Sequence, residues 1–137
     1  MNDTNATDLP VHRGSCHCGH LTFSVRMDAT KASRCNCRIC TKLGTLGAIV
    51  SPAQFTFAGD RATLSRYGNE VGTRYFCPTC GVHAFSEGHL DILGGDFVSI
   101  NVNTLDDVDQ GTIEVGYWDG RHDNWQAGLR PTPWPIA

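Results

Sequence analysis

Cys35-Asn36-Cys37-Arg38-Ile39-Cys40 places three thiols within six residues, at spacings of two and three. Thiolates this close together favour a soft metal with tetrahedral sulfur ligands, above all zinc. Two further clusters flank this triplet: Cys16-His17-Cys18-Gly19 precedes it and Cys77-Pro78-Thr79-Cys80-Gly81 follows it. All seven cysteines of the chain lie in these three clusters, which indicates metal binding.

The number of thiols predicts two different zinc sites. A structural zinc takes four protein ligands, whereas a catalytic zinc keeps one position open. The outer clusters supply two thiols each and together make one closed site from Cys16, Cys18, Cys77 and Cys80. The triplet of Cys35, Cys37 and Cys40 is then one ligand short. We therefore expect two zinc ions per chain, one structural and one catalytic.

Two alternatives to an open second site remain. A histidine could close it, and the chain offers His12, His17, His20, His83, His89 and His122. Disulfides are the other alternative, although an odd number of cysteines leaves at least one thiol unpaired. Residues 1–8 have neither the basic nor the apolar region of a secretory signal. We therefore expect a cytoplasmic protein, in which clustered cysteines more often mean metal or redox chemistry.

Length and charge limit the remaining possibilities. The 137 residues predict one domain, with a disordered segment at 1–10 and a zinc-binding body at 11–137. A net charge of -3 without a basic run disfavours nucleic acid as a partner. No apolar run approaches the length of a membrane span, so we expect no membrane partner either. Nothing in the sequence predicts the oligomeric state.

Short alternating patterns predict a mainly β fold. In residues 21–25, Leu21, Phe23 and Val25 are expected on the buried face of a strand. Similar patterns predict strands at 47–50, 55–57, 64–67, 73–76, 82–85, 97–102 and 112–118. The clearest helical signal follows the triplet, where residues 40–44 could form one turn closed by Gly44. The proline-rich tail at 129–136 is expected to lie extended over the body.

The three tryptophans, Trp118, Trp125 and Trp134, admit two interpretations. They either wall a pocket or, as residue statistics favour, close the core of a small sheet.

The order Cys-x-Cys-Gly, Cys-x-Cys-x-x-Cys, Cys-x-x-Cys-Gly resembles the glutathione-dependent formaldehyde-activating enzyme family, which includes centromere protein V. Residues 74–77 and 101–107 also resemble the segments that accompany the cysteine clusters in that family. The resemblance runs from about residue 14 to 118. It implies a β-tent, an arrangement of small zinc-stabilised β-sheets. It also implies structural zinc ligands at Cys16, Cys18, Cys77 and Cys80, and catalytic ones at Cys35, Cys37 and Cys40. The implied activity is that of a carbon–sulfur lyase that joins formaldehyde to glutathione, as an S-(hydroxymethyl)glutathione synthase does.

Three thiolates suit this chemistry. They make a zinc centre that activates water poorly but accepts a soft fourth ligand, such as a substrate thiol that loses its proton on binding. The thiolate can then attack an electrophilic carbon, or leave from one in the reverse direction. The predicted partner is therefore a small thiol, with glutathione as the first candidate.

Several polar residues could contribute to such a site. Arg38 and Lys42 lie next to the triplet and could attract the carboxylates of a substrate, or could be solvated charges beside an anionic metal centre. His83, His122 and Asp123 are candidates for a general acid or base.

A hypothesis from another functional class is a non-catalytic, zinc-stabilised protein-binding module, for which centromere protein V is the precedent. A zinc-buffering protein is a weaker alternative. A filled fourth position at the triplet would favour the module, and an open position beside a lined pocket would favour the enzyme.

Overall fold

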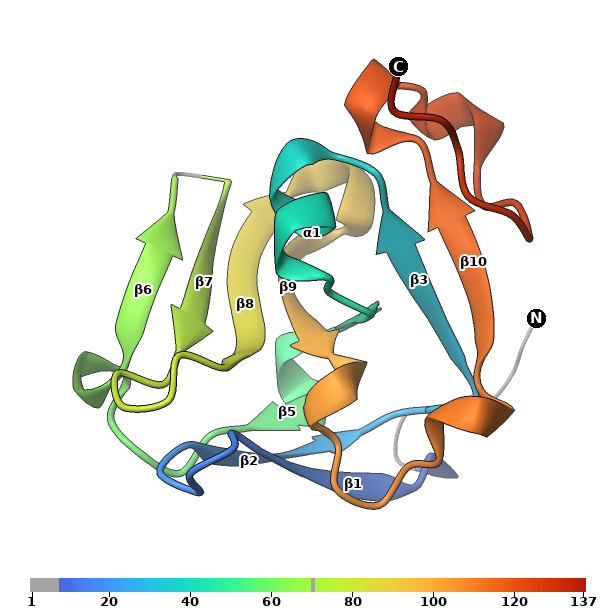
Figure 1. Ribbon diagram of the computed structural model, residues 1–137. Coiled ribbons are helices and arrows are strands. Elements are labelled where there is room, and N and C mark those ends of the chain that lie inside the picture. Colours follow the sequence, from blue (N-terminus) through green and yellow to red (C-terminus); the bar gives the residue numbers. More distant parts are fainter. Residues whose placement is uncertain (1–7, 70) are drawn as a thin grey trace.

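The computed structural model describes residues 8–69 and 71–137, which form a mainly β, single-domain structure with two sheets (Figure 1). The strands are β1 (Val11–Ser15), β2 (Thr22–Arg26), β3 (Lys31–Cys35), β4 (Gly47–Val50), β5 (Phe55–Thr56), β6 (Ser65–Gly68), β7 (Gly72–Phe76), β8 (His83–Leu90), β9 (Gly95–Asn101) and β10 (Glu114–Trp118). The described α-helix is α1 (Arg38–Leu43). Short 3-10 turns lie at Pro52–Gln54, Arg61–Thr63, Asp91–Leu93, Val102–Thr104, Gln110–Thr112, Gly120–His122 and Trp125–Ala127.

Most of the segment predicted to be disordered, residues 1–7 of 1–10, lies outside the described residues. Within the described part, the carbonyl of Leu9 accepts a hydrogen bond from Arg26, and that of Pro10 accepts one from the amide of Met27. No helix of the described chain is long and apolar enough to cross a membrane.

The two sheets differ in size. The small sheet has the strand order β1-β2-β5, and the large sheet has the order β10-β3-β4-β9-β8-β7-β6. Neighbouring strands are antiparallel except β10 and β3, whose parallel pairing sets Trp118 beside Cys35. The C-terminal strand therefore lies next to the strand that leads into the cysteine triplet. In Figure 1 the large sheet fans upward from the small one, and α1 and the C-terminal segment lie at its upper end.

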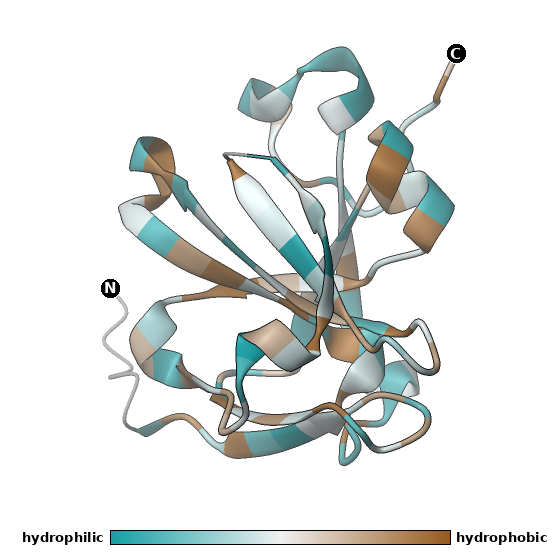
Figure 2. Ribbon diagram, turned by 90° about the vertical axis from the view of Figure 1, so that its left-hand side faces the viewer, coloured by the Kyte–Doolittle hydropathy of each residue, from teal (hydrophilic) through white to brown (hydrophobic). Residues whose placement is uncertain are grey.

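The core lies where the two sheets meet. Leu21, Phe23 and Val25 of the small sheet are at most 5% exposed, which confirms the predicted buried face. Phe55 packs against Phe85 of the large sheet with ring centroids 4.6 Å apart, and Tyr75 stacks on the same ring at 5.1 Å. Each such fully buried side chain contributes about 1.5–3 kcal/mol. Hydrophobic segments accordingly gather at this junction in Figure 2.

The opposite side of the large sheet, called the outer face below, carries smaller and more polar residues. Tyr75, Phe85 and both neighbours of Ser99 are buried in the core. Because side chains alternate along a strand, Arg74, Ser86 and Ser99 stand on the outer face. The strand register places these three residues side by side across β7, β8 and β9.

The tryptophans do not close the core, so the interpretation favoured by residue statistics is wrong. Trp125 is 50% exposed, and Trp118 and Trp134 are only half-buried. The rings of Trp118 and Trp125 lie 6.0 Å apart, and the indole of Trp134 donates to the Tyr117 carbonyl at 2.9 Å. Together with the bridge between Tyr117 and Arg130, these contacts lay the tail along β10, as its prolines predicted.

Two elements are longer than their sequence patterns indicate. Strand β8 continues to Leu90, although the residues after Phe85 are mostly polar. Glu87 can lie within this strand because Arg61 neutralises its carboxylate with two hydrogen bonds, at 2.7 and 2.9 Å. Helix α1 begins at Arg38, two residues before the predicted turn, and ends as predicted at Gly44, whose φ of 68° is left-handed.

Candidate metal centres

The structure brings Cys16, Cys18, Cys77 and Cys80 together from two different sheets. The first two lie between β1 and β2, and the last two lie in the turn between β7 and β8. Their four Sγ atoms lie within 4.8 Å of one another. The Cys16–Cys18 and Cys18–Cys77 sulfur distances are 3.7 and 3.5 Å. Four Zn–S bonds of about 2.3 Å in a tetrahedron separate the sulfurs by about 3.8 Å, so the cluster fits a zinc ion.

Backbone amides around this four-thiol cluster favour thiolates. The amide of Leu21 donates to Cys16 Sγ at 3.2 Å, and the amides of Thr79 and Cys80 donate to Cys77 Sγ at 3.3 and 3.4 Å. These last two hydrogen bonds hold the pKa of Cys77 below its ordinary value. Amides of Val82 and Cys18 lower the pKa of Cys80 to about 6. Thiolates of Cys77 and Cys80 therefore form at lower pH, as ligands that zinc can take up without much competition from protons. The His20 amide lowers the pKa of Cys18, but the hydrogen bond with Cys77 and burial outweigh it and raise that pKa to about 11.

The triplet forms where β3 passes into α1. Cys35 ends the strand, Cys37 caps the helix N-terminus and Cys40 lies in its first turn. The three Sγ atoms lie within 4.8 Å of one another, and the amide of Cys37 donates to Cys35 Sγ at 3.4 Å. Hydrogen bonds from Cys35 and Cys40 lower the pKa of Cys37 to about 2, while the thiols of Cys35 and Cys37 raise the pKa of Cys40. The triplet is therefore a cluster of the size that zinc requires.

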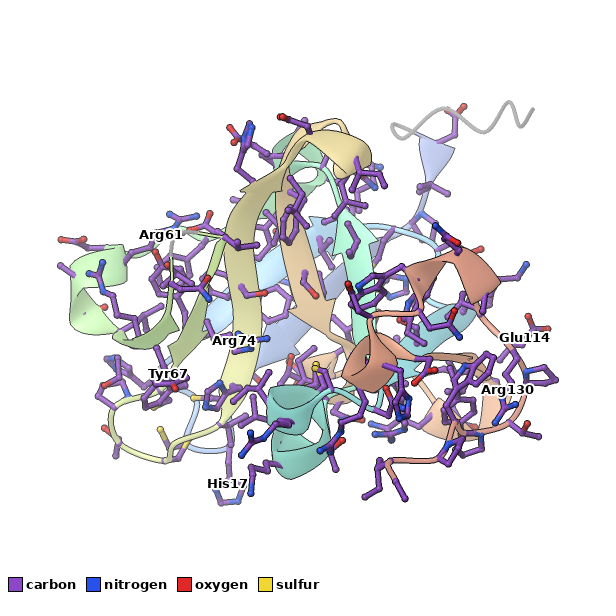
Figure 3. The ribbon with its side chains drawn as sticks, turned by 90° about the horizontal axis from the view of Figure 1, so that it is seen from above. His17, Arg61, Tyr67, Arg74, Glu114 and Arg130 are labelled. Atoms are coloured by element: carbon purple, nitrogen blue, oxygen red, sulfur yellow. The ribbon has the colours of Figure 1, made fainter. Side chains whose placement is uncertain are left out.

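Neither of the alternatives to an open second site finds support in the described residues. All seven cysteines are free, and the 3.5 and 3.7 Å sulfur distances far exceed a disulfide bond of about 2.05 Å. No histidine joins either thiol cluster in the part of the chain that the structure describes. His17 is exposed and points away from the body in Figure 3. His83 instead stacks on Phe76, with ring centroids 4.6 Å apart.

Asn36, inside the triplet, is held by the C-terminal segment. Its Nδ2 donates to Asp119 Oδ1 at 2.7 Å and to the Pro135 carbonyl at 3.1 Å. Its Oδ1 accepts from the Arg121 amide at 2.8 Å, and its own carbonyl accepts from Arg121 Nε at 2.9 Å. Gly120 packs so closely that a Cβ atom there would lie 2.5 Å from Cys35 Sγ. Residues distant in sequence therefore fix the backbone that carries the three thiols.

Asp119 is the buried centre of this arrangement, at 4% exposure. It accepts hydrogen bonds from Asn36, from His122 Nδ1 at 2.6 Å and from Asn124 Nδ2 at 3.3 Å. Burial alone would raise the pKa of Asp119, but these hydrogen bonds outweigh it and hold the pKa below its ordinary value. Asp119 is therefore a carboxylate that orients His122. Asp123, the neighbouring candidate, is exposed and accepts from the Trp125 indole at 2.8 Å instead.

A hollow of about 420 Å³ lies beside α1, lined by Arg38, Thr41, Lys42, Arg121 and Ile136. Three of these five residues are cations, and no carboxylate is among them. The hollow therefore suits an anionic ligand, and it contains both basic residues that the sequence placed beside the triplet.

His83 is the third acid–base candidate. Its Nδ1 is buried and has no hydrogen-bond partner within the described residues. Burial, together with the nearby charge of Arg74, lowers the pKa of His83 and keeps the imidazole neutral.

Three residues of the candidate site were missed from sequence: Asn36, Asp119 and Arg121. Asn36 could have been found, because a short polar residue between two metal ligands often bonds the adjoining backbone. Asp119 and Arg121 gave no such signal, since their role depends on the parallel pairing of β10 with β3.

Comparisons with known proteins agree with this architecture. A crystal structure of a Rhodobacter sphaeroides protein matches with a TM-score of 0.65 and 24% identity, over 77% of this chain and 99% of that one. At this identity the match shows the fold alone. The family model of the glutathione-dependent formaldehyde-activating enzyme matches residues 11–120, a span that includes both thiol clusters. The chain therefore belongs to the glutathione-dependent formaldehyde-activating enzyme family.

Proposed function

We propose that this protein is a zinc-dependent carbon–sulfur lyase that acts on a small thiol adduct, as an S-(hydroxymethyl)glutathione synthase does. The observation that carries the proposal is the three-thiol cluster of Cys35, Cys37 and Cys40 at the start of α1, the helix whose basic residues line a cationic hollow. Membership of a family named for glutathione and formaldehyde supports the same substrate class.

The two thiol clusters receive different roles in this proposal. Cys16, Cys18, Cys77 and Cys80 hold a structural zinc, because four thiolates complete its coordination. Cys35, Cys37 and Cys40 hold the catalytic zinc, which when bound supplies a soft Lewis acid that lowers the pKa of an added thiol from about 8.5. Residues 11–137 form the domain that contains both, and residues 1–10 precede it.

The residues of the hollow bind the rest of the substrate. Glutathione carries two carboxylates, and Arg38, Lys42 and Arg121 offer guanidinium and ammonium donors to them. Ile136 supplies an apolar wall. Because Arg38 and Lys42 belong to the helix whose first turn carries Cys40, an anchored substrate places its sulfur near the triplet. Holding the reactants in this way supplies the proximity contribution to the rate.

The reaction forms one bond and shifts one electron pair. The thiolate sulfur attacks the carbonyl carbon of formaldehyde, the π electrons move to the oxygen, and that oxygen takes up a proton to give the hydroxymethyl thioether. The reverse direction breaks the same carbon–sulfur bond. We assign transfer of the thiol proton to His122, because Asp119 fixes its imidazole and leaves the side chain 40% exposed.

Cobalt substitution tests the proposal, because the visible spectrum of cobalt responds to a new sulfur ligand. We expect saturating glutathione to change the spectrum of the cobalt protein. The Arg38→Gln/Lys42→Gln variant should weaken the binding of glutathione about tenfold but leave the binding of 2-mercaptoethanol, which has no carboxylate, unchanged. A spectrum that ignores glutathione and other small thiols would contradict the lyase and favour the non-catalytic protein-binding module.

A further inference from the structure

Arg74 is a half-buried cation on the outer face of β7. No hydrogen bond or ion pair of its guanidinium is found among the described residues. Arg61, which faces the other side of the sheet, is by contrast neutralised by Glu87. A half-buried charge without a partner costs desolvation energy, so its retention calls for an anion that binds there.

The position of Arg74 relates it to the triplet. The outer face carries Ser86 directly beside Arg74, and α1 lies next to β8 in both Figure 1 and Figure 3. Figure 3 looks onto this face and shows Arg74 in front of β8, on the side where α1 lies. Arg74 therefore stands on the same side of the sheet as the helix that carries Cys37 and Cys40.

The cationic hollow and Arg74 serve different parts of a ligand. At about 100° per residue, Arg38 and Lys42 project from the side of α1 opposite to Cys40, and Thr41 lies between them and Cys37. The hollow thus lies on one side of the thiols, and Arg74 approaches them from β7. A thiol whose carboxylates occupy the hollow leaves Arg74 for whatever is attached to its sulfur.

We propose that Arg74 binds the oxygen of the electrophile and stabilises the negative charge that this oxygen acquires when the thiolate adds to the carbonyl carbon. The inference rests on the proposed function and names one of its catalytic residues. As the carbon–sulfur bond forms, the π electrons of the carbonyl move to oxygen, and the guanidinium N–H groups donate hydrogen bonds to it. The oxygen then takes a proton from water, and Arg74 keeps its own proton throughout.

A donor fixed in this way stabilises the negative charge at the atom where that charge develops. Its hydrogen bond to that atom is stronger in a partly buried setting than in water. Removal of a comparable oxyanion donor lowers turnover about 10²–10³-fold. Ser86 and Ser99, which share the face with Arg74, have small side chains. Ile49 continues the same row on β4 and is 55% exposed, so the row is open to solvent there.

Two probes of the same shape test the inference without turnover. S-(carboxymethyl)glutathione carries an anionic oxygen near its sulfur, and S-(carbamoylmethyl)glutathione replaces it with a neutral amide. We expect calorimetry on the zinc-loaded protein to show the carboxymethyl probe binding about tenfold more tightly. Arg74→Gln should bring the ratio of the two affinities close to one and should also lower turnover about 10²–10³-fold.

Arg66→Gln is the matched control, because Arg66 lies on the adjoining strand with its guanidinium 5.8 Å from the centroid of the Tyr75 ring. It should keep the tenfold ratio. An unchanged ratio in Arg74→Gln overturns the inference. A loss of glutathione affinity with the ratio retained also overturns it, since Arg74 would then only balance the charge of the metal centre. A wild-type protein that binds neither probe nor glutathione overturns the proposed function itself.

Discussion

Replacing Asn36 with alanine tests whether the C-terminal segment sets the geometry of the triplet. The change removes three hydrogen bonds, to Asp119, to the Pro135 carbonyl and from the Arg121 amide. At about 0.5–1.5 kcal/mol net for each, the free energy of unfolding should fall by about 1.5–4.5 kcal/mol. The thiols themselves are untouched, so both metal centres keep their ligands.

The more informative quantity is the affinity of the triplet for zinc. Residues that orient metal ligands through hydrogen bonds typically contribute about 10–100-fold to the affinity for the metal. We expect Asn36→Ala to lower the affinity at Cys35, Cys37 and Cys40 by that factor and to leave the four-thiol cluster unchanged. Competition with a chromophoric chelator should resolve the two zinc ions, and denaturant unfolding gives the stability.

Asn124→Ala is the control for this experiment. Asn124 donates to the same carboxylate at 3.3 Å, and within the described chain it forms no hydrogen bond with residues 35–40. It should cost less than about 1 kcal/mol and leave both zinc affinities intact. If Asn36→Ala loses stability while the triplet keeps its zinc affinity within about twofold, the thiols hold their geometry alone and the reasoning is wrong.

Two further predictions concern the division between the centres and the buried imidazole. Cys80→Ser should unfold much of the protein, because the free energy of zinc binding at a site that joins both sheets contributes directly to folding. Cys37→Ser should lose one zinc and retain most of the fold. Equal destabilisation of the two variants, measured by denaturant unfolding, would refute this division. The pKa of His83 is lowered, so its contribution to stability is present above about pH 6.5 and is lost as the pH falls through the folded pKa, because the unfolded chain binds the proton first. His83→Phe keeps the stacking on Phe76 and removes an unpaired Nδ1, so it should add about 1–2 kcal/mol at pH 7 and flatten the decline below about pH 6.5. Urea unfolding at several pH values measures both effects, and an unaltered pH dependence would refute them.

Local patterns predicted most of the fold. Alternation identified the buried side of β2, and Gly44 marked the end of α1, because both signals act within a few residues. The thiol spacing likewise indicated which cysteines meet, although Cys18 and Cys77 lie 59 residues apart. Metal ligands can be paired by counting, since zinc accepts a fixed number.

The rest of the candidate site depends on tertiary contacts that no local pattern encodes. The tryptophans were misassigned because residue statistics do not register that β10 is an edge strand, along which the proline-rich tail lies. The sequence does not show that Arg74 stands on the outer face, because this follows only from the burial of its neighbour Tyr75 in the core. Asp119 looks like an ordinary turn residue until β10 is placed beside β3, which brings it to Asn36.

The partners of Asn36 have a consequence for biosynthesis. The four-thiol cluster is complete in sequence once Cys80 has been translated, but the groups that hold Asn36 come from Asp119, Arg121 and Pro135. At about 5–20 residues per second, the ribosome needs about 3–11 s to travel from residue 80 to residue 135. During that interval a nascent chain presents three clustered thiols without their support, open to oxidants and to competing metals. We therefore expect the two centres to acquire zinc in a fixed order, and the triplet to be the one that depends on the metal and redox state of the cell at the moment of synthesis.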